Sequence, residues 1–207
     1  MGFFHGKTSK ETSMLKKLLK LALSRLAIVR RPRLTRRSIC RNDVGQHLSL
    51  GHLHRAMLRA EHVIEEDNML QAFDIIELHC SRVIEHAKQL DKPRECSEDT
   101  MEAAAGIMFA ARWCGELPEL LLARSILEGK FGSDFAATAK EGTSIVDPML
   151  MWKLSGDKTN MELKKKVTKE IAAENNILMD FSEFREAIDQ DDSMILAAFH
   201  IVEHPTI

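Results

Sequence analysis

Apolar side chains recur at three- and four-residue steps from about Ser9 to Leu48, the period of one face of an α-helix. The recurring positions are Met14, Leu15, Leu18, Leu21, Ala22 and Val29. At 1.5 Å per residue this helix would reach roughly 55 Å, far beyond an average globular helix. Pro32 interrupts the pattern, and because proline removes a backbone donor and crowds the preceding turn, we expect a kink between Val29 and Arg31.

A turn and a second periodic stretch come next. The sequence Ser49-Leu50-Gly51 is typical of a turn, and the helical period resumes at Leu53 and continues until shortly before Asp91. Because two long helices joined by a tight turn fold back on each other, the sequence predicts an antiparallel hairpin.

Shorter helices and a tail follow the hairpin. The expected helices run from about Glu98 to Trp113, from Pro118 through Leu127, over residues 133–140 and 147–154, and through Leu163, Val167 and Ile171. We expect residues 1–12 to form an N-terminal segment, 13–180 a helical domain and 181–207 a tail. One apolar run in the tail, Met194 to Val202, is expected to dock as an extra helix.

The composition narrows the fold class. Of the 207 residues, 44% are hydrophobic, 29% are charged and 5% are aromatic, and tyrosine is absent. The apolar content suffices for folding, while the scarcity of aromatic residues argues against a sheet-rich protein, whose strands are normally filled by aromatic and β-branched residues. We therefore expect an all-α protein: a long antiparallel hairpin of the first two helices, with three or more shorter helices packed on it.

Charge is divided unevenly along the chain. Residues 1–41 contain twelve of the 29 basic residues and one of the 31 acidic residues, a net charge of +11, which leaves −13 for the other 166 residues. A basic block of this kind indicates an anionic partner, which is a membrane, a nucleic acid or an acidic face of a neighbouring chain.

A helical projection separates the bases of the first helix into two groups. Arg25 and Arg36 project into the apolar stripe and Arg33 lies at its edge, whereas six other bases face or flank the opposite side. The outward group is Lys16, Lys17, Lys20, Arg30, Arg31 and Arg41. A one-signed face is unusual, because exposed helices normally intersperse acids among their bases.

The second helix carries acids where the first carries inward arginines. Asp67 and Asp74 fall within its apolar stripe. With the turn centred near residue 50, we expect Arg25 to pair with Asp74, and Arg33 or Arg36 to pair with Asp67. Such pairs would fix the register of the hairpin more than they would add stability, because desolvation offsets most of the Coulomb attraction.

Signatures of catalysis, metal binding and membrane spanning are weak. Residues 2–8 resemble a phosphate-binding loop, but three residues separate the glycines where four are needed. His200 and His204 lack a third metal ligand, and the four cysteines contain no CxxC pair, which favours reduced thiols. The apolar stretch 18–29 is interrupted by Lys20 and Arg25 and is too short to span a bilayer. We therefore expect no enzyme, no cofactor and no metal.

Several segments resemble one known family, the increased sodium tolerance-one family of ESCRT-III-like regulators of the endosomal-sorting AAA ATPase. The similar segments are Leu19–Leu26 (LKLALSRL), Arg59–Asn68 (RAEHVIEEDN), Ala72–Leu78 (AFDIIEL), Ile107–Arg112 (IMFAAR), Leu117–Leu121 (LPELL), Lys130–Phe135 (KFGSDF) and Lys166–Asn176 (KVTKEIAAENN). The resemblance extends over about 165 residues, from Met14 to Asp180.

The resemblance implies an ESCRT-III fold and a non-enzymatic adaptor in multivesicular-body sorting. It implies association and copolymerisation with the charged multivesicular body proteins, and a cytoplasmic protein that is peripheral on the endosomal membrane. Carried over to this chain, the hairpin-register positions are Arg25 and Asp74. The positions implied for lipid contact are Lys16, Lys17, Lys20, Arg30, Arg31 and Arg41.

The tail bears on how far the family function transfers. Longer relatives end in a helix that binds the ATPase, and because nothing from Phe181 to Ile207 reproduces it, we expect only indirect association with the ATPase.

The alternatives to a membrane adaptor are a basic-arm nucleic-acid binder and an inactive soluble paralogue. Nucleic acid is not expected as a partner, because no aromatic residue is interleaved with the bases from Lys16 to Arg41.

Overall fold

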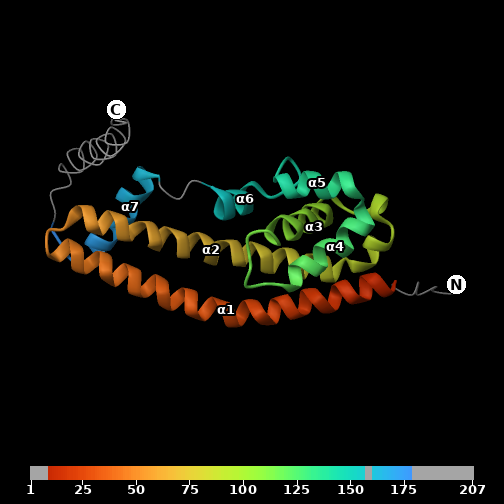
Figure 1. Cartoon of the computed structure of the whole chain (residues 1–207), viewed down its shortest axis with the longest axis horizontal. Coiled ribbons are helices and arrows are strands. Elements are labelled where there is room, and N and C mark those ends of the chain that lie inside the picture. Colours follow the sequence, from red (N-terminus) through yellow and green to blue (C-terminus); the bar gives the residue numbers. More distant parts are fainter. Residues whose placement is uncertain (1–8, 157–159, 179–207) are drawn as a thin grey trace, which may run out of the picture. The chain divides into compact units, whose positions relative to one another are not determined.

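The computed structural model describes residues 9–156 and 160–178, and every regular element in these ranges is a helix (Figure 1). The elements are α1 (Lys10–Ser49), α2 (Leu53–Glu85), the short 3₁₀ helices η1 (Ala87–Asp91) and η2 (Pro93–Glu95), α3 (Glu98–Ala110), α4 (Glu119–Phe131), α5 (Ser133–Glu141), α6 (Pro148–Ser155) and α7 (Met161–Glu174). The predicted all-α class is confirmed. The predicted run Met194 to Val202 lies outside the described residues.

Most predicted boundaries hold to within a few residues. The first helix ends at Ser49 and the second begins at Leu53, so the predicted turn is correct, and Gly51 adopts a positive φ of 73° in it. The second α-helix ends earlier than predicted, at Glu85, and continues as 3₁₀ turns. Pro118 precedes α4 as its N-cap and is not its first residue.

Pro32 lies inside α1 and does not end it. Because proline has no N–H, the carbonyl of Ile28 has no partner in the helix ladder. Pro32 and Ile28 are both exposed, so water can satisfy this carbonyl at the surface. The predicted interruption therefore costs one backbone hydrogen bond without breaking the helix.

The chain divides into two compact units, and each contains part of both long helices. The first unit comprises residues 1–37 and 65–158. Its core is centred on α3, whose residues from Ala103 to Ala110 are all buried. Leucines of α1, apolar residues of α2 and leucines of α4 and α6 pack around this helix. From Ala103 to Ala110 the helix is apolar on every side and is buried on every side, and its small alanines allow close packing.

Gly106 lets α3 approach α2 closely in the first unit. A Cβ atom at position 106 would lie 2.1 Å from Nδ1 of His79.

His79 is itself 2% exposed, and its Nδ1 has no hydrogen-bond partner among the described residues. Burial lowers the pKa of His79 from 6.5 to about 4, with Asp147 opposing this shift and Arg82 adding to it. The imidazole is therefore neutral at neutral pH.

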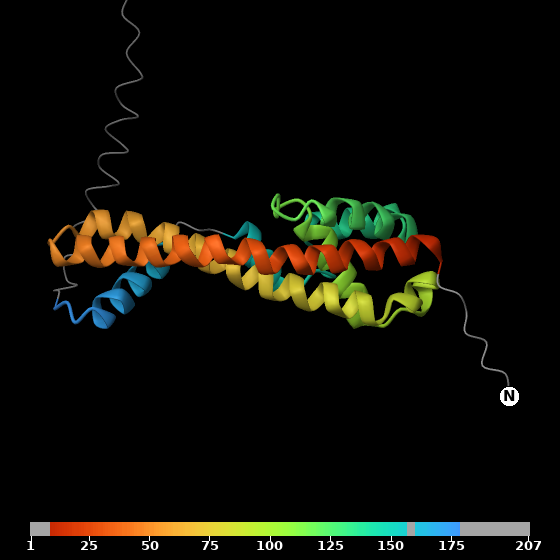
Figure 2. The same ribbon diagram turned by 90° about the horizontal axis from the view of Figure 1, so that it is seen from below.

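The second unit comprises residues 38–64 and 159–207, of which 38–64 and 160–178 are described. It consists of the turn end of the hairpin and α7, which lies beside it (Figure 2). Val167, Ile171 and Ala172 of α7 pack into a core with apolar residues of both hairpin helices. Lys164 of α7 binds Glu61 at 2.7 Å, so polar contacts reinforce this packing.

Replacing Gly106 by alanine tests the close approach of α3 and α2. We expect Gly106→Ala to destabilise the protein by about 1–3 kcal/mol, because the added methyl collides with the buried His79 ring. Gly129→Ala is the matched control, since Gly129 lies in α4 with open space around it, and it should stabilise the helix by roughly 0.5–1 kcal/mol. Urea denaturation measures both, and equal effects would contradict the predicted collision.

Burial of neutral His79 predicts an acid-sensitive first unit. The pKa of His79 is lowered in the folded state, so the unfolded chain takes up the proton first, and stability falls as the pH drops from about 6.5 to about 4. The full loss is on the order of 3 kcal/mol. Unfolding free energies across this range should show a slope that His79→Leu removes. A slope that is unchanged in His79→Leu would assign the acid sensitivity to other groups.

Candidate functional site

Acidic side chains bind six arginines of α1, and they come from several elements. In the first unit, Arg25 pairs with Glu119, Arg30 with Asp74 and Glu77, Arg33 with Glu66 and Glu116, Arg36 with Glu66, and Arg37 with Asp67. In the second unit, Arg41 pairs with Glu174 of α7. The arginines of α1 thus hold the surrounding elements against this helix.

The predicted pair of Arg25 with Asp74 is wrong. Arg25 binds Glu119 at the start of α4, with Nε donating to both carboxylate oxygens at 2.8 and 3.0 Å. These hydrogen bonds lower the pKa of Glu119 below its usual value. Arg30, and not Arg25, lies opposite Asp74, because Arg25 faces α4 instead of α2.

The predicted pairing of Asp67 with Arg33 or Arg36 is also wrong. Asp67 binds Arg37, while Arg33 and Arg36 share Glu66. Arg33 and Glu66 form the most buried of these pairs, with side-chain exposures of 15% and 14%, and the Arg33 guanidinium lies over the Phe73 ring at 5.6 Å. Asp67 and Asp74 therefore do bind arginines of α1, but other arginines than predicted, and Glu66 and Glu77 are two further acids of α2 that contribute.

Two bases that were predicted to face outward are bound within the protein. Arg30 contacts two acids of α2 and Arg41 contacts one of α7, and their side chains are only about a quarter exposed, 22% and 25%. Both lie at the edge of the helix face, where a long guanidinium side chain reaches the neighbouring helix. Their charges are therefore compensated internally.

The other four bases of the predicted outward group have no ion pair with any described residue. Lys17, Lys20 and Arg31 are exposed and Lys16 is half-buried, all in the first unit. Figure 2 looks onto this part of α1, which lies in front of the other helices of the unit and is not covered by them. We call Lys16, Lys17, Lys20 and Arg31 the basic face.

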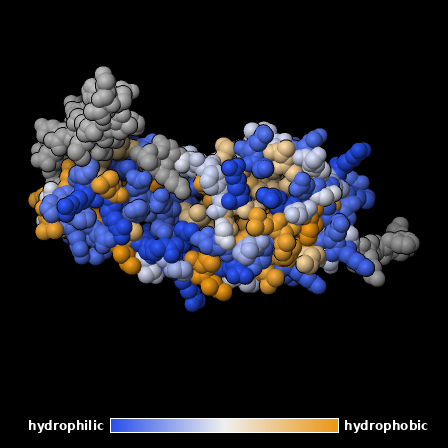
Figure 3. Space-filling model, viewed as in Figure 1, coloured by the Kyte–Doolittle hydropathy of each residue, from blue (hydrophilic) through white to orange (hydrophobic). Residues whose placement is uncertain are grey.

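Apolar side chains accompany the basic face. Met14, Leu21 and Ile28 are 49%, 56% and 69% exposed, so the prediction that Met14 and Leu21 belong to the buried stripe is wrong. Leu15, Leu18, Leu19, Ala22 and Leu26 form the buried side of α1. Figure 3 shows hydrophobic residues along the edge of the first unit where α1 runs in Figure 1.

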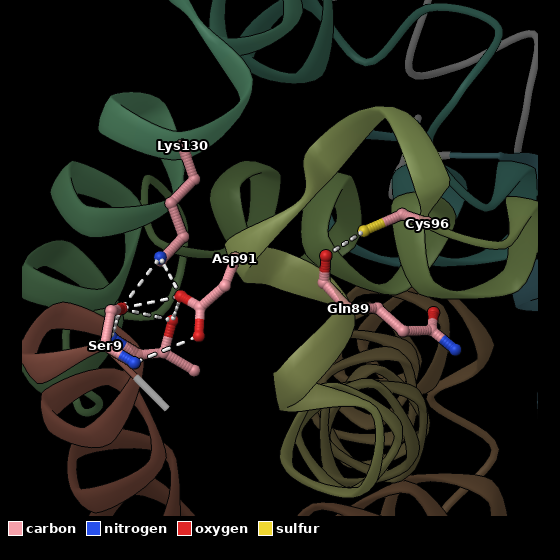
Figure 4. Close-up of polar contacts among 6 residues, drawn as sticks. Ser9, Gln89, Asp91, Cys96 and Lys130 are labelled. Carbon is pink, nitrogen blue, oxygen red and sulfur yellow. Dashed lines mark hydrogen bonds and ion pairs between the residues drawn. The ribbon is translucent and has the colours of Figure 1, made fainter. Parts of the chain in front are cut away.

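Asp91 fixes the N-terminal end of α1 (Figure 4). This end of the helix, and not Asp91 itself, is close in sequence to the basic face. Its Oδ1 accepts hydrogen bonds from the hydroxyls of Ser9 and Thr12, both at 2.6 Å, and from Lys130 Nζ at 3.0 Å. Its Oδ2 accepts one from the Ser9 amide at 3.0 Å. Burial alone would raise the pKa of Asp91, but the hydroxyls of Ser9 and Thr12, the Ser9 amide and Lys130 together hold it well below its usual range.

The Asp91 cluster has the composition of a catalytic site without its geometry. Ser9 Oγ and Lys130 Nζ both donate to Oδ1 of Asp91, so the serine hydroxyl is directed at the carboxylate and not at the lysine as a base. The hydroxyl of Ser9 instead caps α1, because its oxygen accepts a hydrogen bond from the backbone N–H of Thr12. Within residues 9–156 and 160–178, no group of three His, Cys, Asp or Glu is placed to hold a metal ion.

Comparison with known proteins identifies the family. The family model Ist1, described as a regulator of Vps4 activity in the MVB (multivesicular body) pathway, matches residues 16–178. This chain belongs to the Ist1 family. The matched range starts at Lys16 and contains the whole basic face, Glu119 and α7. The resemblance inferred from the sequence is confirmed, and so is a place in the multivesicular-body pathway of protein transport.

A solved Ist1 structure has the same fold. The chain is similar to the crystal structure of the S. cerevisiae Ist1 N-terminal domain in complex with the Did2 MIM motif, with a TM-score of 0.71 and 22% sequence identity. The match covers 83% of this chain and 96% of the yeast domain. The ESCRT-III-like fold predicted for this Ist1-family chain is therefore confirmed. Among its described helices, none combines the length and the apolar character that crossing a bilayer requires.

Proposed function

We propose that this Ist1-family chain is a non-enzymatic adaptor of the multivesicular-body pathway that binds anionic membrane through the basic face of α1. It works on the cytoplasmic side of the endosome as a peripheral protein. The observation that carries this proposal is a contrast among the bases of α1. Acids of the protein bind six arginines, whereas no described acid binds Lys10 or the four bases of the basic face.

The magnitude of the charge interaction suits reversible binding. Each base near an anionic bilayer contributes about 1 kcal/mol, so the basic face supplies several kcal/mol. This attraction acts over about one Debye length, roughly 10 Å at 0.1 M salt, and weakens as salt is added. An adaptor that binds in this way associates with a membrane and leaves it again.

Partner binding is the second part of the proposal. The solved yeast relative is in complex with a MIM motif of Did2. We infer that this chain likewise binds such motifs of the charged multivesicular body proteins and assembles with these ESCRT-III subunits into homo- or hetero-polymers. The family description concerns Vps4, and we propose that this chain reaches that ATPase indirectly, through the subunits that it binds.

Nucleic acid is the less favoured anionic partner. Proteins that bind single strands combine bases with aromatic side chains on which the nucleobases stack. The sequence of α1 from Lys10 to Ser49 contains no phenylalanine, tryptophan or tyrosine. Its exposed apolar residues are aliphatic or methionine, which suit lipid better than nucleobases.

Charge reversal on the basic face tests the membrane proposal. Wild-type protein should float with vesicles that contain phosphatidylserine and should be released as salt is raised. The triple variant Lys16→Glu/Lys17→Glu/Lys20→Glu should bind on the order of 100-fold more weakly, because three attractive charges become repulsive. Flotation over a lipid titration measures the change.

A second triple variant controls for net charge. Lys88, Lys140 and Lys166 are exposed lysines of η1, α5 and α7 that form no ion pair with a described residue. Lys88→Glu/Lys140→Glu/Lys166→Glu changes the net charge equally and should retain most of the binding. Equal losses in both triples would show that overall charge, and not the basic face, governs lipid binding.

Capture experiments test the partner proposal. We expect an immobilised MIM peptide to retain both the full chain and a chain that ends at residue 178, because the family match ends there. The ATPase should be captured by this protein only when a charged multivesicular body protein is added. Direct capture of the ATPase by the protein alone would contradict the indirect route.

A further inference from the structure

We propose that Met14, Leu21 and Ile28, here called the apolar row, insert into the boundary between headgroups and acyl chains when α1 binds a membrane. This inference rests on the proposed membrane function. It adds to that function a contact that is independent of charge and names the residues that make it.

The apolar row is a continuous strip on one side of a helix. Its members are seven residues apart, and successive heptad positions on an α-helix drift by only about 20°, so the three side chains lie in a band about 40° wide. All three lie in the first unit and are about half to two-thirds exposed. Single exposed apolar residues are ordinary, but a regular row along one helix is a surface that a partner can cover.

The charges around the apolar row point to lipid as that partner. Lys17 lies between Met14 and Leu21 along the helix, Lys20 is adjacent to Leu21, and Arg31 follows Ile28 by one turn. Between Glu11 and Asp43 the helix contains no acid at all. A helix that lies in a bilayer interface has this arrangement, with apolar side chains directed toward the acyl chains and bases at the level of the headgroups.

The hydroxyl groups of this face are already satisfied within the helix. Ser24 Oγ donates to the carbonyl of Lys20 at 3.1 Å, and Thr35 Oγ1 donates to the carbonyl of Arg31 at 3.2 Å. A hydroxyl that is hydrogen-bonded to its own helix costs little when water is removed. The residues between the apolar and basic side chains therefore oppose shallow insertion only weakly.

A second protein helix fits the same face less well. A coiled-coil seam needs two apolar rows, at the a and d positions of each heptad. The second row here consists of Lys17, Ser24 and Arg31. Bases in a protein seam require acids on the partner, whereas in the membrane interface they meet lipid phosphates directly.

The double variant Leu21→Gln/Ile28→Gln tests the inference without changing the charge. We expect it to bind phosphatidylserine vesicles about tenfold more weakly than wild type, and to lose the part of the binding that persists at high salt. The matched control is Leu58→Gln/Leu78→Gln, which changes two exposed leucines of α2 and should bind as wild type does.

A depth measurement gives a second readout. Ile28→Trp should be quenched by lipids with brominated acyl chains, whereas Leu78→Trp should not be quenched above the background that Trp113 and Trp152 give in both proteins. If the fluorescence of Ile28→Trp is quenched no more strongly than that of Leu78→Trp, the proposed insertion is wrong.

The outcomes separate this inference from the proposed function. If wild-type protein does not bind the vesicles at all, both proposals fall. If the lysine triple loses binding while Leu21→Gln/Ile28→Gln binds like wild type, the basic face stands and insertion is overturned. If the double variant keeps lipid binding and loses an ESCRT-III subunit, the apolar row is a protein interface, which also overturns insertion.

Discussion

The pairing of arginines with acids on one side of α1 determines which charges of this protein remain available to a partner. Five arginines of the first unit and one of the second bind carboxylates of α2, α4, α7 or the segment before α4. Arginine suits these positions because its planar guanidinium can bind two oxygens or two acids at once, as Arg30 and Arg33 do. The lysines Lys16, Lys17 and Lys20 stand elsewhere on the helix, and no described acid binds them.

Packing and the ion pairs together fix the orientation of α1 about its own axis. In the first unit Leu15, Leu19 and Leu26 are buried to 1% exposure or less, so turning the helix would cost several apolar contacts as well as the salt bridges. Asp91 holds the N-terminal end through Ser9 and Thr12 and thereby ties it to η1 and α4. The basic face and the apolar row are therefore parts of a packed helix and need little ordering when they bind, which lowers the entropic cost of association.

Periodicity and turn residues predict the fold of this chain well, because they are local properties. The spacing of leucines and the Ser49-Leu50-Gly51 turn are sufficient to place both long helices. Ion-pair partners depend on tertiary contacts: Arg25 was assigned to α2, but Glu119, its partner, belongs to a helix whose position no local pattern reveals. The sequence does not reveal the apolar row for a related reason. Because α1 has leucines on both sides, a helical projection alone does not distinguish the exposed Leu21 from the buried leucines.

The division of α1 into a bound side and an available side also shows how the proposed binding to an anionic surface is compatible with a net charge of only −2. Beyond a Debye length the opposite charges of the two parts of the chain largely cancel, so long-range attraction to a membrane is weak. At contact the cancellation fails, because the acids that neutralise the arginines lie on the packed side of α1, while Lys17, Lys20 and Arg31 are exposed on the other side. The membrane binding that we propose then depends on short-range contact of one helix face, in which the apolar row and the bases act together. A protein of this design would respond to the composition and packing of the lipid directly beneath it more than to the overall surface potential.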